Sequence, residues 1–590
     1  MLDPRIYRTG LVAVALAVIV LAFSLENQPG PLTTTLAPEA FNGGHAYATM
    51  TQLAKQYPNR RPGTPADRAI ANGVAKRLSG DNFYVTRDVF EGQTADGKRT
   101  LENVIGVRPG LTPGAVVMVA HRDALGSPAT AEASGTSVLE ELANDLSGET
   151  HHHTIVLAST SGSGGAAGAA QLARSLPRPV DAVVVLGDLA GRDVRQPVVV
   201  PWSNNPVVAP PQLRNTVATA LSQQARLSPG ASSLGGQFAH LAFPFTATEQ
   251  GPFGVQDQSA VLLSVSGDRA PVADEPVSAT RIASMGRTAL QTVNALDGGR
   301  SVPGPSAYLL FDGKVVPAWA MRLFVLALMV PVLGATIDGI ARVRRRGHSV
   351  LRWAMWVLCA ALPFVFGLVL VYVVKLIGGF PATPSAPVGA DVVPPHGTGA
   401  VVLAILAAVI GLSLLIVRPI LIRIAGLGKP GVVRDMSAPG AAAGLMAVLC
   451  VVALVMWVSN PYAAALLIPA LHLWLLVVAP DLRLRRPVAL ALLLAGITPP
   501  ALVIAYYALV LGLDPIGLLW NGVLLVAGGH IGALAAVEWS IVLGCALSLV
   551  LIGARSVPLP AAEERPLTTR GPVTYAGPGS LGGTKSALRR

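Results

Sequence analysis

The sequence predicts an α/β sandwich domain joined to an α-helical bundle that spans a membrane. Apolar residues make up 52% of the 590 residues and charged residues only 13%, whereas soluble proteins have about 25% charged residues. The charge deficit is uneven, because residues 40–310 have ordinary soluble composition while the second half is a series of apolar runs broken by Arg clusters. Within the first stretch, helical periodicity alternates with short β-branched runs, which indicates a mixed sheet between helices.

The first element is an apolar run over residues 10–23 that follows Arg5 and Arg8. No clean small-residue cleavage site comes after it, so we predict an uncleaved signal anchor over residues 1–26, with a cleaved signal peptide as the alternative. A positively charged flank stays inside, which sends the following domain out of the cytoplasm.

Residues 37–310 are expected to form the exported domain. The patterns predict helices over residues 46–56, 66–78, 138–146, 165–176, 212–224 and 279–296, and strands over 104–107, 115–120, 154–158, 182–186 and 260–265. Ligands of open α/β sheets bind beyond the carboxyl ends of the strands. Functional side chains are therefore expected directly after each β run.

The second half contains apolar runs that are each long enough to cross about 30 Å of hydrocarbon. They cover residues 319–341, 353–376, 399–417, 440–458, 461–480, 488–512 and 516–553. The last run is too long for one span, and Gly528-Gly529 predicts a half-inserted hairpin over 518–527 before a span over 531–552. Two full spans are the alternative. We expect a bundle of about seven spans over residues 319–553.

The basic residues concentrate in every second connection of this half, which is where membrane topology puts them on the cytoplasmic side. The charge of +11 is thereby accounted for without nucleic-acid binding. Residues 554–590 form a basic tail rich in Pro and Gly, predicted to be disordered and cytoplasmic. The excess of Arg, Ala, Gly and Val is typical of high-GC bacteria, so we expect a multi-pass protein of a bacterial plasma membrane with residues 37–310 outside.

Three motifs of the exported region occur in a particular order: Ala120-His121-Arg122-Asp123, Ala133-Ser134-Gly135 and Leu186-Gly187-Asp188. This series resembles metallopeptidase family 28, the di-zinc aminopeptidases. The resemblance implies a zinc-aminopeptidase-like sandwich. It also implies that His121 corresponds to a zinc ligand, that Asp123 corresponds to the residue orienting it, and that Asp188 corresponds to a further ligand.

The remaining positions of the family's site are altered in this chain. The carboxylate that bridges the metals falls on Ala131, although a slip of one residue would put Glu132 near that place. The Gly-Glu-Glu that supplies the general base is replaced by the stretch 161–165, and the final His of the family corresponds to Gln250. A hydrolytic zinc site needs about three protein ligands and a base. Peptidase chemistry is therefore not expected, and His121, Asp188 and Glu132 constitute at most a vestigial mononuclear site.

Two histidine groups have simpler interpretations. We interpret His121 and Asp123 as a hydrogen-bonded pair that supports the loop after its strand. The run His151-His152-His153 stands at the start of a strand, where successive side chains point to opposite faces and cannot all reach one ion. We expect a solvated turn there. The three cysteines lie inside apolar runs and offer the exported domain no thiol ligand.

Polar residues inside apolar runs are functional candidates, because a membrane interior penalises them. They are Asp338, His472, Asn521, His530 and Glu538. His530 and Glu538 are eight residues apart, which on one helix would put them on one face about two turns apart. A proton or ion relay is one hypothesis, and hydrogen bonds that pack the bundle are the other.

The domain order resembles the GPI transamidase subunit with an aminopeptidase-like domain, and the multi-span endoplasmic-reticulum metallopeptidases. Our leading hypothesis is a non-catalytic exported domain that binds a protein or lipid-linked partner of the cell envelope. The alternatives are a zinc-dependent membrane peptidase with substituted ligands, and a transporter or lipid-handling protein with an exported cap. We expect the lipid bilayer and an envelope protein as partners, no nucleic acid, and no cofactor unless zinc is retained.

Overall fold

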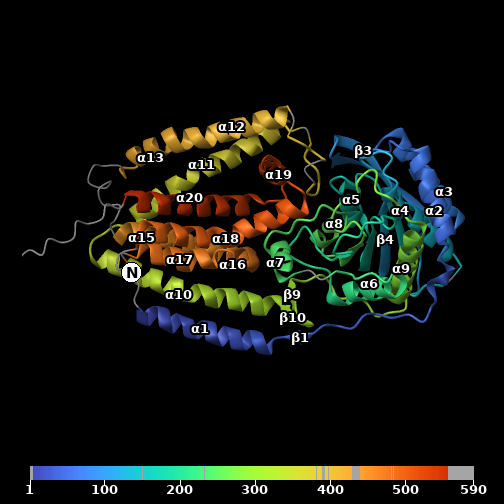
Figure 1. Ribbon diagram of the computed structural model, residues 1–590, viewed down its shortest axis with the longest axis horizontal. Coiled ribbons are helices and arrows are strands. Elements are labelled where there is room, and N and C mark those ends of the chain that lie inside the picture. Colours follow the sequence, from blue (N-terminus) through green and yellow to red (C-terminus); the bar gives the residue numbers. More distant parts are fainter. Residues whose placement is uncertain are drawn as a thin grey trace, which may run out of the picture.

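The computed structural model describes residues 4–148, 150–230, 233–380, 382–388, 392–395, 397–427, 439–479, 482 and 484–555. It consists of an α/β domain seated on one end of a long helical bundle (Figure 1). Both parts of the predicted fold class are confirmed. The tail predicted to be disordered lies outside the described residues from residue 556 onward.

A seven-stranded mixed sheet forms the centre of the α/β domain, in the order β2-β3-β5-β4-β6-β8-β7. The strands are β2 (Tyr84–Thr94), β3 (Gly97–Arg108), β4 (Ala115–His121), β5 (Thr154–Thr160), β6 (Val180–Leu186), β7 (Val199–Val200) and β8 (Ala260–Leu263). The strands β5, β4, β6 and β8 run parallel, and the outer strands are antiparallel to their neighbours. Parallel strands covered on both faces are continuously apolar, which explains why β4 is buried from Ala115 through Ala120.

Helices cover both faces of this sheet. They are α2 (Gly43–Gln56), α3 (Pro65–Gly80), α4 (Ser134–Asp145), α5 (Ala167–Ser175), α6 (Pro211–Gln224), α7 (Leu234–Ala242), α8 (Gly251–Val255) and α9 (Ala279–Asp297), with short 3-10 turns η1 (Pro38–Ala40) and η2 (Ala131–Ala133). Val116 and Met118 pack into the core that contains α2, α3, α4, α6 and α9, whereas Val117 and Val119 pack on the side of α5, α7 and α8. The alternation of side chains along a strand thus builds two cores from one apolar run.

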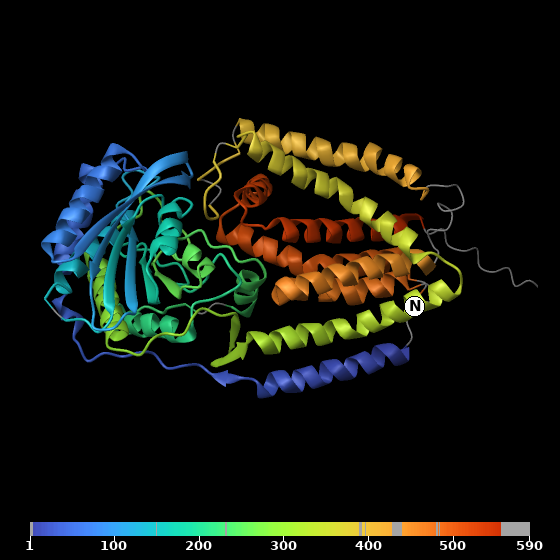
Figure 2. The same cartoon turned by 180° about the vertical axis from the view of Figure 1, so that it is seen from behind.

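The bundle begins with α1 (Pro4–Phe23), which packs along α10 (Ala318–Arg345) (Figure 2). A small sheet of β1 (Glu26–Asn27), β10 (Lys314–Pro317) and β9 (Tyr308–Phe311) joins the ends of these two helices. The remaining elements are α11 (Val350–Leu376), α12 (Thr398–Leu412), the π-turn η3 (Ser413–Val417), α13 (Arg418–Ile424), α15 (Pro439–Ser459), α16 (Pro461–Ala465), α17 (Ile468–Val478), α18 (Arg486–Val510), α19 (Pro515–Gly528) and α20 (Ala533–Arg555).

Eight helical segments within the described residues are long and apolar enough to cross a membrane, so the chain is a membrane protein. The predicted break near Gly528-Gly529 is present, because Gly529 has φ +84° and ends α19. This helix has only 14 residues, about 21 Å at the helical rise, and is too short to span. Residues 515–528 thus form one short apolar helix before a helix long enough to span, and the half-inserted hairpin over 518–527 stays a prediction.

The α/β domain is joined to the bundle through α7, a helix that the sequence did not predict. Asn460, which caps α16, donates through Nδ2 to the backbone oxygens of Leu241 (2.8 Å) and Ala242 (3.2 Å). His240 stacks on Trp202 with ring centroids 4.5 Å apart and lies within hydrogen-bond distance of the hydroxyl of Tyr507. These hydrogen bonds and the ring contact attach α7 of the α/β domain to the bundle.

The prediction of a solvated turn at 151–153 is wrong for two of its three histidines. His151 and His153 are buried, and both bind Asp297 at the end of α9: His151 Nδ1 lies 3.0 Å from Asp297 Oδ2, and the amide of His153 donates to Oδ1 at 2.7 Å. His152 points away and is exposed. The alternation of side chains correctly predicted that the three histidines do not point to one side. It could not predict the partner of His153, because Asp297 at the end of α9 is 144 residues away in the chain.

Candidate functional site

A cavity of about 500 Å³ lies beyond the carboxyl ends of β4, β6 and β8, at the edge where ligands of such sheets bind. The strand ends supply His121, Asp188 and Ser264 to its wall. The opposite wall comes from the bundle, with Val388 and Val392 before α12, and Leu511 and Gly512 directly after α18. The cavity is therefore built by both halves of the protein.

His121 ends β4 and is bound by a residue that the sequence analysis did not single out. Its Nδ1 lies 3.2 Å from Glu249 Oε2, and the side chains of His121 and Glu249 are 14% and 4% exposed. The hydroxyl of Thr160, at the end of β5, donates to Glu249 Oε1 at 2.8 Å. Glu249 thus links the ends of two neighbouring strands beneath the cavity.

The electrostatic environment of His121 favours its charged form. Burial lowers the pKa of the imidazole, but the hydrogen bond and charge of Glu249, together with Asp123 and Glu132, raise it to about 9. Burial raises the pKa of Glu132 to about 7, against the opposing effects of His121 and Arg60. Shifted pKa values in a cleft are typical of functional sites, although structural ion pairs cause them as well.

Asp123 does not pair with His121, so this part of the prediction is corrected. Its Oδ1 accepts from the amide of Gly162 at 3.0 Å, and its Oδ2 accepts from the amide (3.0 Å) and hydroxyl (2.8 Å) of Ser163. The carboxylate braces the loop that replaces the family's Gly-Glu-Glu. The expectation that Asp123 supports a loop agrees with this contact, while the partner is the loop after β5.

Asp188 follows β6, and its carboxylate is engaged by protein donors. Oδ1 accepts from the amides of Ala190 (3.0 Å) and Gly191 (2.8 Å), which is an Asx turn. Oδ2 accepts from the hydroxyl of Ser266 at 2.6 Å. Asp188 lines the cavity, but its donors hold the turn after β6.

Glu132 lies in η2 and lines the same cavity. The segment before it is fixed by the buried Arg60, whose guanidinium donates to the backbone oxygens of Pro128 (2.9 Å) and Ala129 (2.5 Å). The slip from Ala131 to Glu132 therefore brings a carboxylate to the cavity, where its charge interacts with those of His121 and Asp188.

A zinc ion requires about three side-chain ligands in tetrahedral geometry. Among the described residues, no group of three or more His, Cys, Asp or Glu side chains is arranged to hold a metal. His121 faces Glu249, and both oxygens of Asp188 accept from protein donors. As the side chains stand, the donor set does not fit zinc, and the site of His121, Asp188 and Glu132 remains a prediction.

The position of the family's general base is occupied by a serine with a structural role. The hydroxyl of Ser161 donates to Asp67 Oδ2 at 2.6 Å, and Asp67 Oδ1 forms an ion pair with Arg122 Nε at 2.7 Å. Gln250 is buried and donates through Nε2 to the hydroxyl of Thr246 at 2.9 Å. Neither residue supplies a carboxylate or imidazole to the cavity.

Several functional contacts could not be found from the sequence. The one available signal was Glu249, since Thr248-Glu249-Gln250 stands where the family has Ser-Asp-His and keeps an acid in the middle. Nothing in the sequence indicated that Val388, Val392 and Leu511 form a cavity wall, because single apolar residues are common throughout the membrane half.

The polar residues of the apolar runs have separate roles. His530 precedes α20 and does not share a helix face with Glu538, which corrects the predicted geometry. His530 Nε2 donates to the backbone oxygen of Pro384 at 3.0 Å, and Asn521 donates to that of Val388 at 2.9 Å. These two residues thus hold the segment that carries the bundle's wall of the cavity.

The other three polar residues lie elsewhere in the bundle. Asp338 forms an ion pair with Arg342 on the next turn of α10, at 2.7 Å. His472 binds the backbone oxygen of Leu328 at 2.9 Å and the hydroxyl of Tyr7 on α1. Glu538 is buried in α20, and its Oε1 has no hydrogen-bond partner among the described residues. The contacts of His472 are those of helix packing.

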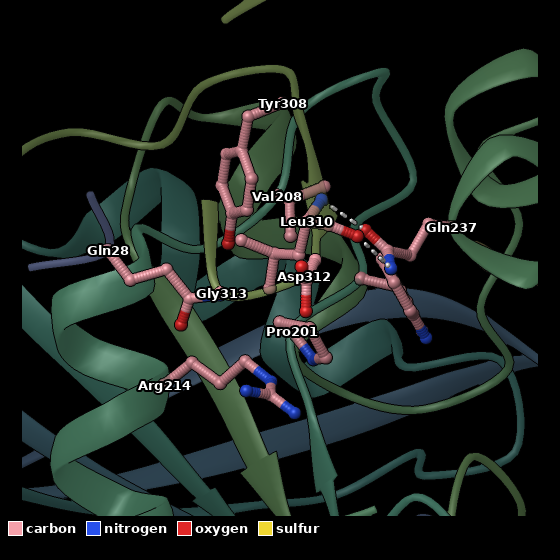
Figure 3. A pocket seen from close by; sticks show the side chains of 10 residues that line it. Gln28, Pro201, Val208, Arg214, Gln237, Tyr308, Leu310, Asp312 and Gly313 are labelled. Carbon is pink, nitrogen blue, oxygen red and sulfur yellow. Dashed lines mark hydrogen bonds between the residues drawn. The ribbon is translucent and has the colours of Figure 1, made fainter. Parts of the chain in front are cut away.

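A second cavity, of about 290 Å³, lies between α6, α7 and the β9–β10 hairpin (Figure 3). Its polar side chains bind the backbone around them: Tyr308 donates to Ala209, Arg214 donates to Gly230, and Gln237 pairs with both polar groups of Leu310. We interpret this cavity as part of the junction with the membrane helices. The candidate functional site is the cavity at the strand ends.

Comparisons with known proteins give structural likeness only. No family model and no curated protein matches the chain. A zinc aminopeptidase from Bacillus subtilis is similar at 13% identity and a TM-score of 0.35, covering 43% of this chain and 94% of its own. An aminopeptidase from Aneurinibacillus sp. strain AM-1 is similar at 11% identity and a TM-score of 0.37, covering 45% and 96%. The glutaminyl cyclase of Porphyromonas gingivalis is similar at 16% identity and a TM-score of 0.33, covering 43% and 98%.

Proposed function

We propose that this membrane protein uses its α/β domain as a binding module without peptidase chemistry. Its cavity receives a polypeptide or lipid-linked partner at the outer surface of a bacterial plasma membrane. The observation that carries the proposal is the shared wall of the cavity, because Leu511 and Gly512 lie at the end of a spanning helix. A ligand in this cavity touches the strand ends and the membrane half together.

The state of the polar residues supports a binding role. Asp123 and Asp188, which match the family's motif, are both saturated by donors of the protein itself. The position of the general base holds Ser161, which serves the pair of Asp67 and Arg122. Without a base to activate water, hydrolysis by the family's route has no proton acceptor.

The orientation of the protein in the membrane follows from its charge distribution. The Arg clusters at the end of α10 and in α13 lie at the end of the bundle opposite the α/β domain (Figure 1). Basic ends of spanning helices stay on the cytoplasmic side. The α/β domain is therefore extracytoplasmic in this proposal, as in the GPI transamidase subunit that the domain order resembles.

The alternative, a zinc peptidase with substituted ligands, is favoured by one observation. Glu249 adds a carboxylate beside His121 that the family's pattern did not predict. A rotation of Glu249 away from His121 would free an imidazole and a carboxylate next to Glu132.

Metal analysis of the purified full-length protein separates the two functions. Elemental analysis after exposure to zinc is expected to give the same low zinc content for the wild type, His121→Ala, Asp188→Ala and Glu132→Ala. The control variant is His152→Ala, which removes an exposed histidine far from the cavity. About one zinc per chain in the wild type and in the control, lost in the three cavity variants, would overturn the proposal and favour the peptidase.

A further inference from the structure

Two arginines line the cavity and have no counter-charge. Arg195 follows β6 and Arg269 follows β8, and both contribute to the cavity wall. Within the described part of the chain, neither guanidinium forms an ion pair or a side-chain hydrogen bond. Arg60 and Arg122 differ from them, because both are buried and their guanidiniums donate to carbonyl or carboxylate oxygens.

Arg195 and Arg269 line the same cavity, where Arg195 is half-buried and Arg269 is exposed. The pKa of Arg269 is lowered by burial and by the charge of Arg195. The amide of Arg195 donates to the backbone oxygen of Val265 at 2.7 Å, which ties its loop to the end of β8. Two like charges on the wall of one cavity repel each other, and an anion that binds both would offset that repulsion.

The same cavity has an apolar wall that meets the membrane half. Val388, Val392 and Leu511 belong to it, and Leu511 lies one residue beyond the end of α18. Ile516 and Leu519, on the short helix α19 that follows Leu511 in the chain, are 58% and 65% exposed, so exposed apolar side chains follow directly after the cavity wall in sequence. A cavity that has two arginines on one wall and apolar side chains on another is complementary to an amphiphilic ligand.

We propose that the cavity binds a membrane lipid with an anionic phosphate headgroup, whose phosphate lies between Arg195 and Arg269 and whose acyl chains leave past Leu511. This inference rests on the proposed function and names the chemical class of its ligand. Guanidinium groups bind phosphate through paired, charge-assisted hydrogen bonds. An anionic headgroup at the outer end of α18 would reach the pair without leaving the membrane surface.

Two of the three carboxylates that line the cavity are bound by other protein groups, and the charge of the third, Glu132, interacts with those of His121 and Arg60. Glu249 is bound by His121 and Thr160, and Asp188 by its turn and Ser266. The phosphate is therefore directed to the mouth formed by Arg195 and Arg269, and the floor around His121 remains for the headgroup's hydroxyl or amine donors.

Native mass spectrometry of the full-length protein in mild detergent tests the lipid class. Phosphatidylglycerol and phosphatidylcholine are added in equal amounts, and bound lipid is identified by mass. Phosphatidylglycerol is expected to bind about tenfold more tightly than phosphatidylcholine, and the doubly substituted Arg195→Gln, Arg269→Gln protein is expected to lose that difference. Arg192→Gln, which removes an exposed arginine outside the cavity, is the matched control and is expected to bind as the wild type does.

A second measurement distinguishes a lipid from a soluble phosphate. Leu511→Asn is expected to weaken the binding of short-chain phosphatidylglycerol several-fold and to leave the binding of glycerol phosphate unchanged, since only the lipid has chains to lose contact. Glycerol phosphate that binds as tightly as the lipid would overturn the membrane source. Equal binding of both lipids by the wild type, or unchanged binding in the double variant, would overturn the site itself.

The outcome is separable from that of the metal analysis. Zinc in the cavity together with a functional Arg195–Arg269 pair would refute the non-catalytic role and leave the lipid site standing. A protein without zinc whose lipid binding ignores both arginines would retain the proposed binding role and refute the lipid. A peptide that binds through the two arginines in place of lipid would likewise refute the lipid and keep the binding role.

Discussion

His121 and Arg122 are neighbours in the chain but have opposite surroundings. Arg122 is 1% exposed, forms an ion pair with Asp67, and donates to the backbone oxygens of Ser159 and Glu102. His121 faces a cavity, and its one side-chain partner within the described part of the chain is Glu249. Both groups are charged and poorly exposed, so burial of charge does not by itself mark a functional site.

The comparison indicates that a buried charged residue is a candidate for ligand binding when its hydrogen-bonding groups are not all bound by other protein atoms. Arg122 and Asp67 have their hydrogen-bonding groups directed at fixed protein atoms, which leaves nothing for a ligand. Among the residues that the structure describes, the His121 side chain in the cavity has a hydrogen bond only through Nδ1, and the guanidiniums of Arg195 and Arg269 have no side-chain partner. A folded protein tolerates such groups where a ligand or water completes them.

The largest loss of stability is expected from removing the charge of Arg122, which is bound by Asp67 and by backbone oxygens. Arg122→Met leaves Asp67 buried without its cation and strands the carbonyls of Ser159 and Glu102. Breaking a buried ion pair on one side costs about 3–5 kcal/mol. Thermal unfolding of the full-length protein in detergent should show a large decrease in melting temperature, while Arg192→Met, at an exposed position, should show none. A melting temperature close to the wild type's would mean that Asp67 finds another donor.

A smaller effect is expected at the cavity. Glu249→Gln keeps a hydrogen-bond acceptor for Thr160 but removes the charge that faces His121. A hydrogen bond to a charged group contributes about 1.5–3 kcal/mol, and Glu249→Gln keeps part of it. The loss of stability should be clearly less than that of Arg122→Met. Asp257→Asn, at an exposed acid on the same segment, provides the control, and a loss equal to that of Arg122→Met would contradict the comparison.

The smallest change in stability is expected at the ion pair of His151 and Asp297, whose contribution depends on pH. Burial lowers the pKa of His151, but the hydrogen bonds to Asp297 and to the backbone of Leu146, together with the charge of Asp297, outweigh burial and raise the net pKa. The pKa of Asp297 is lowered, since its hydrogen bonds to His151 and His153 outweigh burial. A raised histidine pKa stabilises the fold fully below the unfolded value of about 6.5 and loses this contribution as pH rises through the folded value.

The corresponding carboxylate contribution is present above about pH 3.9 and is lost as pH falls through the lowered value. The stability difference between the wild type and His151→Asn should therefore be larger at about pH 6 than at about pH 9. Unfolding curves at the two pH values measure it. His152→Asn, at the exposed neighbour, should give no pH-dependent difference, and an equal difference at both pH values for His151→Asn would show that the ion pair adds nothing.

The hydrophobic periodicity of the sequence predicted many of the helices and strands. The central strands and most helices of the α/β domain lie where periodicity predicted them, with ends that shift by a few residues, as β5 (Thr154–Thr160) does against the predicted 154–158. The strand β1 was missed because two residues cannot establish a period. The helix α7 and the eleven-residue strand β2 were also not predicted, although both are as long as elements that were. β1 pairs with β10, and α7 packs against α16 of the bundle.

The sequence by itself determined the two-part architecture, the apolar segments, and the absence of the carboxylates at 131 and 161–165 and of the histidine at 250 that metallopeptidase family 28 has. These features depend on composition, on apolar length and on the identity of single residues, all of which are local. Only the tertiary structure decided that Glu249 binds His121 across 128 residues, and that Leu511 and Val388 close the cavity of Arg195 and Arg269. Such contacts arise when packing brings distant segments together, and no period or spacing along the chain encodes which distant side chain will be the partner.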